Sequence, residues 1–148
     1  MSPFALPGRP LSPLGRTACL SLASLLAGLL LLATSVQPDP RGYGTHEQLG
    51  MKPCAFRAIL NIPCPTCGGT TSFAHFVRGD WRASFHANSA AFAFAFLSTL
   101  LAPWLVMSAL IGRLYGVTGA DWVFIGLVAI LASIGFSSWL VRILPALR

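Results

Sequence analysis

The chain has 148 residues, enough for one small domain. Apolar residues make up 55% of it and charged residues only 9%, whereas about a quarter of a soluble domain is charged. This composition excludes a domain that faces water on all sides. The net charge is +6, but the basic residues are scattered between apolar runs, which is typical of juxtamembrane anchors and not of a nucleic-acid surface. The sequence therefore predicts a protein in contact with the lipid bilayer and no nucleic-acid partner.

Three apolar stretches without charged residues are long enough to cross a bilayer, which takes about 20 residues in a helix. They cover residues 18–36, 89–111 and 122–141. Because every backbone amide in hydrocarbon must be paired within its own segment, all three are expected to be helices. The alternation AFAFAF at residues 91–96 resembles a strand. It lies inside a much longer uncharged run, so length favours a helix.

The first span allows two interpretations. Residues 1–17 form a basic, proline-rich tail in which Arg9 and Arg16 precede the apolar stretch. A cleaved secretory signal has this arrangement, but its apolar core is shorter than this one. The small residues at 33–35 also make a mediocre cleavage site. We therefore expect a transmembrane signal anchor that stays uncleaved.

Between the first two spans the sequence predicts the loop that carries the chemistry. Residues 37–53 are rich in proline, glycine and polar residues, which is typical of an irregular connector. Residues 54–62 have apolar side chains at helical spacing and predict a short helix that Pro63 stops.

The rest of the loop, residues 70–86, predicts an amphipathic helix at the membrane surface. In a helix, aromatic side chains fall on one face, and histidines and arginines fall on the other. Gly79 is expected to end this helix as a C-cap, and Asp80 to begin a second one as its N-cap. A solvated polar stripe is the simplest role for His75 and His86, and ligation or catalysis is the alternative.

The predicted fold is an all-α membrane protein with three transmembrane helices. A cysteine-containing interfacial loop and a short amphipathic helix connect the first span to the second. The remaining boundaries are the cysteine and amphipathic segment 54–88, the short loop 112–121 and the C-terminal tail 142–148.

Three of the four cysteines share this loop. Cys19 lies in the first span and is expected to be a small buried apolar residue. Cys54, Cys64 and Cys67 form the pattern C-x9-C-x2-C. Two thiols at the closer spacing, with a proline between them and Gly68 after them, resemble a zinc knuckle, in which a tight turn aims both sulfurs at one ion. The pattern favours a metal or structural cysteine site.

A tetrahedral zinc site needs four ligands, and the loop cysteines supply three. The fourth is expected to be His46, His75 or His86, or the position stays open. Thiol–disulfide exchange by Cys64 and Cys67 is an alternative, because a helix N-terminus lowers the pKa of a thiol at its start. The βαβ context of a thioredoxin-like fold is missing from the sequence. A structural disulfide or inert thiols are a third interpretation.

Known catalytic signatures are absent from the sequence. It holds no Gly-x-Ser-x-Gly, no His-Glu-x-x-His and no phosphate loop. Only four residues are acidic, so paired-carboxylate chemistry is not expected. The sequence leaves the question of an enzyme open and favours a non-catalytic role. An accessory subunit of a larger membrane complex, with an unknown membrane-protein partner, is a further alternative.

The side of the membrane that carries the cysteines follows from the distribution of charge. With three spans, the loop and the C-terminal tail share one side and hold seven of the ten Lys and Arg residues. The positive-inside rule then places the loop in the cytoplasm. Against this, Arg9 and Arg16 are typical of an N-terminus held inside, which would place the loop outside. We favour the count, and with it a multi-pass protein of the cytoplasmic (inner) membrane.

A run of motif residues in the segment 54–88 resembles one known family. The residues are Cys54, Phe56, Cys64, Pro65, Cys67, Gly68, Thr70, Gly79, Asp80 and Asn88. They follow the pattern Cys-Pro-Phe, Cys-Pro-x-Cys-Gly-x-Thr-Arg, Gly-Asp and Asn-Pro of a bacterial family of small membrane proteins, the domain of unknown function family twenty-seven fifty-two. The resemblance implies a membrane location and marks the three cysteines as the family's hallmark. It implies no activity.

This chain departs from the family pattern at several positions. Ala55 stands where the family often has proline, and Ser89 where a proline follows the motif asparagine. Asn61 replaces a usual glycine, which is mild because asparagine also tolerates a left-handed backbone. Thr71 stands where the family usually has arginine. If that arginine holds a thiolate or an anionic ligand, this chain must do without it or use Arg78.

Overall fold

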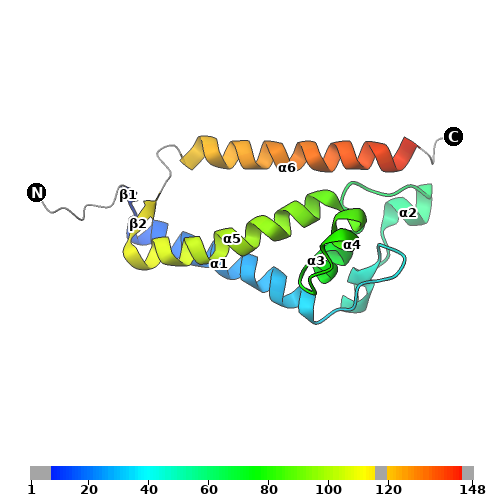
Figure 1. Cartoon of the computed structure of the whole chain (residues 1–148), viewed down its shortest axis with the longest axis horizontal. Helices are drawn as coiled ribbons and strands as arrows, with labels where there is room; N and C mark the ends of the chain where they lie inside the picture. Colours follow the sequence, from blue (N-terminus) through cyan, green and yellow to red (C-terminus); the bar gives the residue numbers. More distant parts are fainter. Residues whose placement is uncertain (1–7, 116–119, 145–148) are drawn as a thin grey trace, which may run out of the picture.

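The computed structural model describes residues 8–115 and 120–144. Three long helices lie lengthwise beside one another, and the shorter elements gather at the two ends of the bundle (Figure 1). The long helices are α1 (Pro13–Thr34), α5 (Ser89–Ile111) and α6 (Ala120–Ile143). Each contains a stretch that is long and apolar enough to cross a membrane, and the cysteine loop connects the first to the second. The predicted all-α membrane fold is therefore confirmed.

Helices α1 and α5 pack against each other through alanine and leucine. Ala23 and Leu26 of α1 lie against Ala102 and Leu105 of α5, and all four side chains are buried. Small residues let two membrane helices approach closely, so that van der Waals packing can hold them together where lipid supplies no hydrophobic force. The outward faces of both helices expose large apolar side chains, as contact with lipid requires.

The end of the bundle away from the cysteines holds a strand pair that the sequence patterns do not predict. β1 (Gly8–Pro10) pairs antiparallel with β2 (Arg113–Tyr115) and joins the chain before α1 to the chain after α5 (Figure 1). α1 also begins earlier than its apolar stretch. Ser12 caps it by accepting a hydrogen bond from the Gly15 N–H (3.1 Å), and Pro13 suits the first helical position.

The other end of the bundle holds the cysteine loop, folded into four short helices. They are η1 (Thr45–Leu49), α2 (Ala55–Leu60), α3 (Gly69–Phe76) and α4 (Trp81–Ala87). Helix α2 ends at Leu60, two residues before the end of the predicted helix at residue 62. Asn61 adopts a left-handed conformation with φ of 54°, and its N–H donates to the Arg57 carbonyl (3.2 Å). Asparagine tolerates this conformation better than most residues, which explains how it can replace glycine here.

The structure divides the predicted amphipathic segment into α3 and α4 at the two expected capping residues. Gly79 has φ of +79°, and Asp80 accepts a hydrogen bond from the Ala83 N–H (3.1 Å) at the start of α4. The two helices then pack against each other through buried hydroxyls. The Ser84 hydroxyl donates to the Ser72 carbonyl (2.7 Å).

The predicted aromatic face of this segment packs on the first half of α5. Phe76 and Phe85 each meet Phe92 edge-on, with ring centroids 5.8 Å apart in both pairs. Phe73 meets Phe94 in the same way at 6.0 Å. Such edge-to-face pairs stabilise a contact by about 1 kcal/mol beyond the area they bury. The AFAFAF stretch is therefore helical, and it supplies the partners of the amphipathic segment.

Arg78 fastens α3 to the end of α1. Its guanidinium donates to the carbonyls of Ala33 (3.2 Å), Thr34 (3.3 Å) and Val36 (2.6 Å), and to that of Ala74 in its own helix (2.7 Å). The last carbonyls of a helix have no partner within the helix, so a cation there satisfies and stabilises them. Arg78 is therefore engaged at α1 and does not replace the motif arginine beside the cysteines.

Helix α6 reaches the cysteine loop with its C-terminal end. The Trp139 indole N–H donates to the carbonyl of Pro63 (2.8 Å), and Arg142 contacts the cysteine turn itself. The third span thus contacts the cysteine loop at Pro63, which precedes Trp139 by 76 residues.

Candidate metal centre

The three loop cysteines come together in the folded protein. The sulfur atoms of Cys54, Cys64 and Cys67 all lie within 4.8 Å of one another. Sulfurs about 2.3 Å from one tetrahedral zinc ion would be about 3.8 Å apart. The thiols are therefore close enough to share an ion after small side-chain rotations. Cys67 is buried, and the other two are partly exposed.

Each thiol owes its place to local backbone structure. Cys54 occupies the N-cap position of α2, with its carbonyl accepting from the Ala58 N–H (2.9 Å). Cys64 and Cys67 bracket a tight turn in which the Cys67 N–H donates to the Cys64 carbonyl (3.1 Å). The next bond, from the Gly69 N–H to a carbonyl inside the turn, leads into α3. This is the knuckle-like turn that the spacing predicts.

Gly68 lets this turn sit between two other segments. Its φ is +82°, a left-handed conformation that favours glycine. A Cβ atom here would collide with the Ala87 carbonyl oxygen and lie 2.7 Å from the Gly42 carbonyl oxygen. Both obstacles are backbone, which cannot rotate away as a side chain can. The motif glycine is therefore required by close packing as well as by conformation.

Asn88 ties the cysteine turn to the second span. Its side-chain amide donates to the carbonyls of Pro65 (3.2 Å) and Cys67 (3.1 Å). Its side-chain oxygen accepts from the Ala91 N–H (2.9 Å) and so caps the N-terminus of α5. One buried residue thus holds the thiol turn and starts the membrane helix, which explains its place in the motif.

The environments of the thiols shift their pKa values in different directions. The backbone N–H of Arg57 hydrogen-bonds the Cys54 sulfur and, as the largest effect, lowers the pKa of that thiol. Burial raises the pKa of Cys67, and the Arg57 side chain partly offsets this. A C-x-x-C oxidoreductase lowers the pKa of a thiol within its pair. Here the lowered pKa is that of Cys54, outside the C-x-x-C pair.

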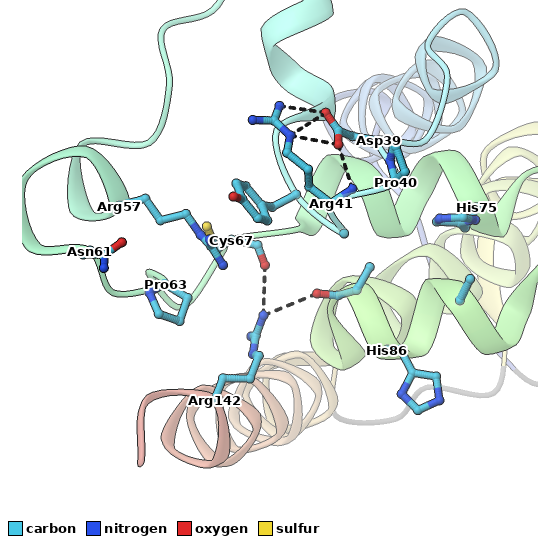
Figure 2. A pocket seen from close by; sticks show the side chains of 14 residues that line it. Asp39, Pro40, Arg41, Arg57, Asn61, Pro63, Cys67, His75, His86 and Arg142 are labelled. Atoms are coloured by element: carbon cyan, nitrogen blue, oxygen red, sulfur yellow. Dashed lines mark hydrogen bonds and ion pairs between the residues drawn. The ribbon is translucent and has the colours of Figure 1, made fainter. Parts of the chain in front are cut away.

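Two arginines flank the thiols, and neither belongs to the sequence-predicted site. Arg57 stacks on the Tyr43 ring, with its Cζ 3.4 Å from the ring centroid, and its guanidinium lies beside Cys67 (Figure 2). Arg142 donates from Nη1 to the carbonyls of Cys67 (3.0 Å) and Ala87 (3.3 Å). The Arg57 side chain at the Cys67 thiol favours the thiolate form, which is the form that binds metals.

The histidines proposed as a fourth ligand lie apart from the thiols. Among the described residues, the cluster of possible ligands around these sulfurs contains the three cysteines and no histidine. His46 contacts the Lys52 carbonyl (3.2 Å), and His75 lies 3.3 Å from the Asp80 carboxylate. His75 and His86 line the same cavity as Cys67, across from Arg57 (Figure 2). The described chain therefore brings three of the candidate ligands together.

The two threonines after the cysteine turn contact the surrounding scaffold. Thr71, where the resemblance leads us to expect arginine, is fully buried and shares a hydrogen bond with the Thr45 hydroxyl (2.8 Å). The Thr45 oxygen also accepts from the Asp39 N–H (3.0 Å), so this pair joins α3 to the connector before it. Thr70 lines a small apolar cavity beside the end of α1.

Helical spacing could have revealed one of the two arginines. Arg57 follows Cys54 by three residues, so on the predicted helix it falls on the same side as the cysteine. Arg142 had no such signal, because 75 residues separate it from Cys67 and only the docking of α6 brings them together.

Comparison with known proteins agrees with the family resemblance inferred from the sequence. Residues 54–105 match the model of the family described as Protein of unknown function (DUF2752), which confirms the resemblance inferred from the motif residues. The match begins at the first motif cysteine and extends into α5. No curated protein and no solved structure shows significant similarity to the chain.

Proposed function

We propose that this chain, whose residues 54–105 match that family of unknown function, holds one zinc-like divalent ion at the surface of a bacterial cytoplasmic membrane. Cys54, Cys64 and Cys67 are its ligands. The observation that carries the proposal is the convergence of three sulfurs to within 4.8 Å from two separate parts of the loop. Thiolates are soft ligands that select zinc, copper(I) or iron–sulfur clusters over harder cations. Zinc is favoured because it binds readily in tetrahedral sulfur sites and does not change its oxidation state.

The geometry supports three protein ligands and a fourth position left open for water or a small molecule. A closed structural site would need a fourth side chain near the sulfurs. The cluster within the described residues offers none, and a cavity of about 930 Å³ borders Cys67. Arg57 and Arg142 stand at this cavity, where they can offset the negative charge of the thiolates.

Metal analysis tests the proposal. Protein purified in detergent without chelator is expected to contain about one equivalent of zinc, and the triple variant Cys54→Ser, Cys64→Ser, Cys67→Ser none, because serine hydroxyls are poor zinc ligands at neutral pH. The matched control is Cys19→Ser, which changes a cysteine of α1 outside the cluster and should keep the full equivalent. Equal and negligible metal in the wild type and the triple variant would contradict the proposal.

We also propose that the cysteine site faces the cytoplasm, following the larger number of basic residues on its side. In intact cells, a membrane-impermeant maleimide should leave Cys54 and Cys64, the partly exposed thiols of the site, unmodified. After permeabilisation in the presence of a chelator, the same reagent should modify them. Modification in intact cells pretreated with the chelator alone would place the loop outside and overturn this orientation.

A further inference from the structure

We propose that the two arginines beside the cysteines bind the phosphate group of an anionic membrane lipid. One acyl chain of this lipid would lie between α6 and the junction of α4 with α5. The proposal concerns a ligand next to the metal centre, and its charge argument rests on the divalent ion of the proposed function. Four observations carry it: two unpartnered guanidinium nitrogens, the charge balance around them, the cavity they line, and a second cavity that continues from it.

The two guanidinium groups each have a nitrogen without a partner. Arg57 Nε and Arg142 Nη2 are buried from solvent and have no hydrogen-bond partner within the described part of the chain. Buried polar groups are nearly always hydrogen-bonded, and leaving one unpaired costs about 1–3 kcal/mol, more for charged groups. A ligand in the cavity would remove this cost once small rotations of the two side chains turn these nitrogens toward it.

The carboxylates of the loop are already paired with basic side chains, and one of these pairs, Asp39 with Arg41, lines the same cavity as Arg57 and Arg142. Asp39 and Glu47 pair with Arg41 at 2.7 Å and 3.3 Å, and Asp80 lies against His75 at 3.3 Å. Because Arg41 neutralises Asp39, the thiols are the unpaired anionic groups beside the two arginines within the part of the chain that the structure describes. Three thiolates with one divalent ion carry a single negative charge, fewer than the two positive charges of the guanidinium groups. The loaded site therefore attracts a further anion.

The cavity beside the thiols suits a phosphate group. Its volume is about 930 Å³, and Arg57 and Arg142 enter it from different elements (Figure 2). Tyr43 and Asn61 also line it and can contribute further polar contacts. Guanidinium groups bind phosphate through paired, charge-assisted hydrogen bonds, which makes arginine the preferred partner of this anion.

A second cavity continues from the first into the predicted membrane region. It has a volume of about 580 Å³, shares Arg142 and His86 with the first cavity, and follows α6 as far as Ser133. The nine residues from Arg142 back to Ser133 correspond to about 14 Å along the axis of α6. The hydroxyls of Ser133 and Ser138 donate to carbonyls of their own helix, so they do not need a polar partner in the cavity. Most of the surface that lines the second cavity is apolar, so an acyl chain fits it, which favours a lipid over free phosphate.

Lipid binding by the full-length protein in a non-ionic detergent tests the proposal. Native mass spectrometry with added phosphatidylglycerol should show one tightly bound lipid. Phosphatidylcholine with the same acyl chains should bind at least about tenfold more weakly, because its choline cation would meet the arginines. Inorganic phosphate at millimolar concentration should not displace the lipid. Displacement by phosphate would assign the site to the free anion and overturn the lipid proposal.

Three single variants complete the test. Arg57→Gln and Arg142→Gln should each weaken phosphatidylglycerol binding about tenfold or more. Arg82→Gln removes an exposed cation of α4 that lines neither cavity, and it should bind like the wild type. Arg142 also holds α6 to the loop, so Arg57→Gln decides the question if the other variant misfolds. Unchanged lipid affinity in Arg57→Gln would overturn the proposal.

Discussion

Gly68→Ala is expected to destabilise the protein by about 2–5 kcal/mol and to prevent assembly of the cysteine site. Two costs add at this position. The left-handed backbone with φ of +82° costs about 1–2 kcal/mol for a residue with a Cβ atom. The new methyl group would also collide with the Ala87 carbonyl and crowd that of Gly42, and such overpacking costs about 1–3 kcal/mol more. Relief of the clash would move the cysteine turn away from α4, with loss of bound metal.

Gly79→Ala is the matched control because it isolates the clash from the backbone strain. Gly79 has nearly the same φ, +79°, but nothing lies within 4 Å of the position of its missing Cβ. The Gly79→Ala variant should therefore lose about 1–2 kcal/mol of stability and keep its metal. Chemical denaturation in detergent, with metal content measured on the same samples, gives both quantities. Equal losses in the two variants would show that the close packing around Gly68 does not matter.

The parts of the fold that depend on local pattern could be predicted from the sequence. The three spans follow from uncharged length, and the capping role of Asp80 follows from its residue type. The grouping of three cysteines follows from their nearness in sequence. In each case the residues that determine the feature lie within about one span length of one another, so a single segment contains the information.

Contacts between distant segments could not be predicted in this way. The sequence presents Arg142 as a charge that flanks the third span. In the structure, the packing of α6 lets its guanidinium donate a hydrogen bond to the Cys67 carbonyl. The sequence predicts Arg78 on the cationic face of an amphipathic helix. In the structure, it donates hydrogen bonds to the carbonyls at the end of α1. In both cases a long, flexible cation finds backbone acceptors whose position depends on how whole helices pack, which sequence periodicity does not encode.

The packing of whole helices also explains why the histidines lie apart from the thiols. Residue type and nearness in sequence make His46, His75 and His86 reasonable zinc ligands. The division of the amphipathic segment at Gly79 sends α4 back along α3, and His75 meets the Asp80 carboxylate near that turn. Arg57 lies at the thiols because it belongs to the same short helix as Cys54. The side chain next to the sulfurs is therefore a cation that favours thiolates and not a fourth ligand.

The coordination sphere of the bound ion tests the central claim most directly. X-ray absorption at the zinc edge of the purified protein should show three sulfur scatterers at about 2.3 Å and one nitrogen or oxygen scatterer at about 2.0–2.1 Å. The three sulfurs are those of the cluster, and the lighter atom is water or a small ligand at the open position. Cys19→Ser should give the same spectrum. A first shell of nitrogen and oxygen without sulfur, in protein that contains one equivalent of zinc, would contradict the account.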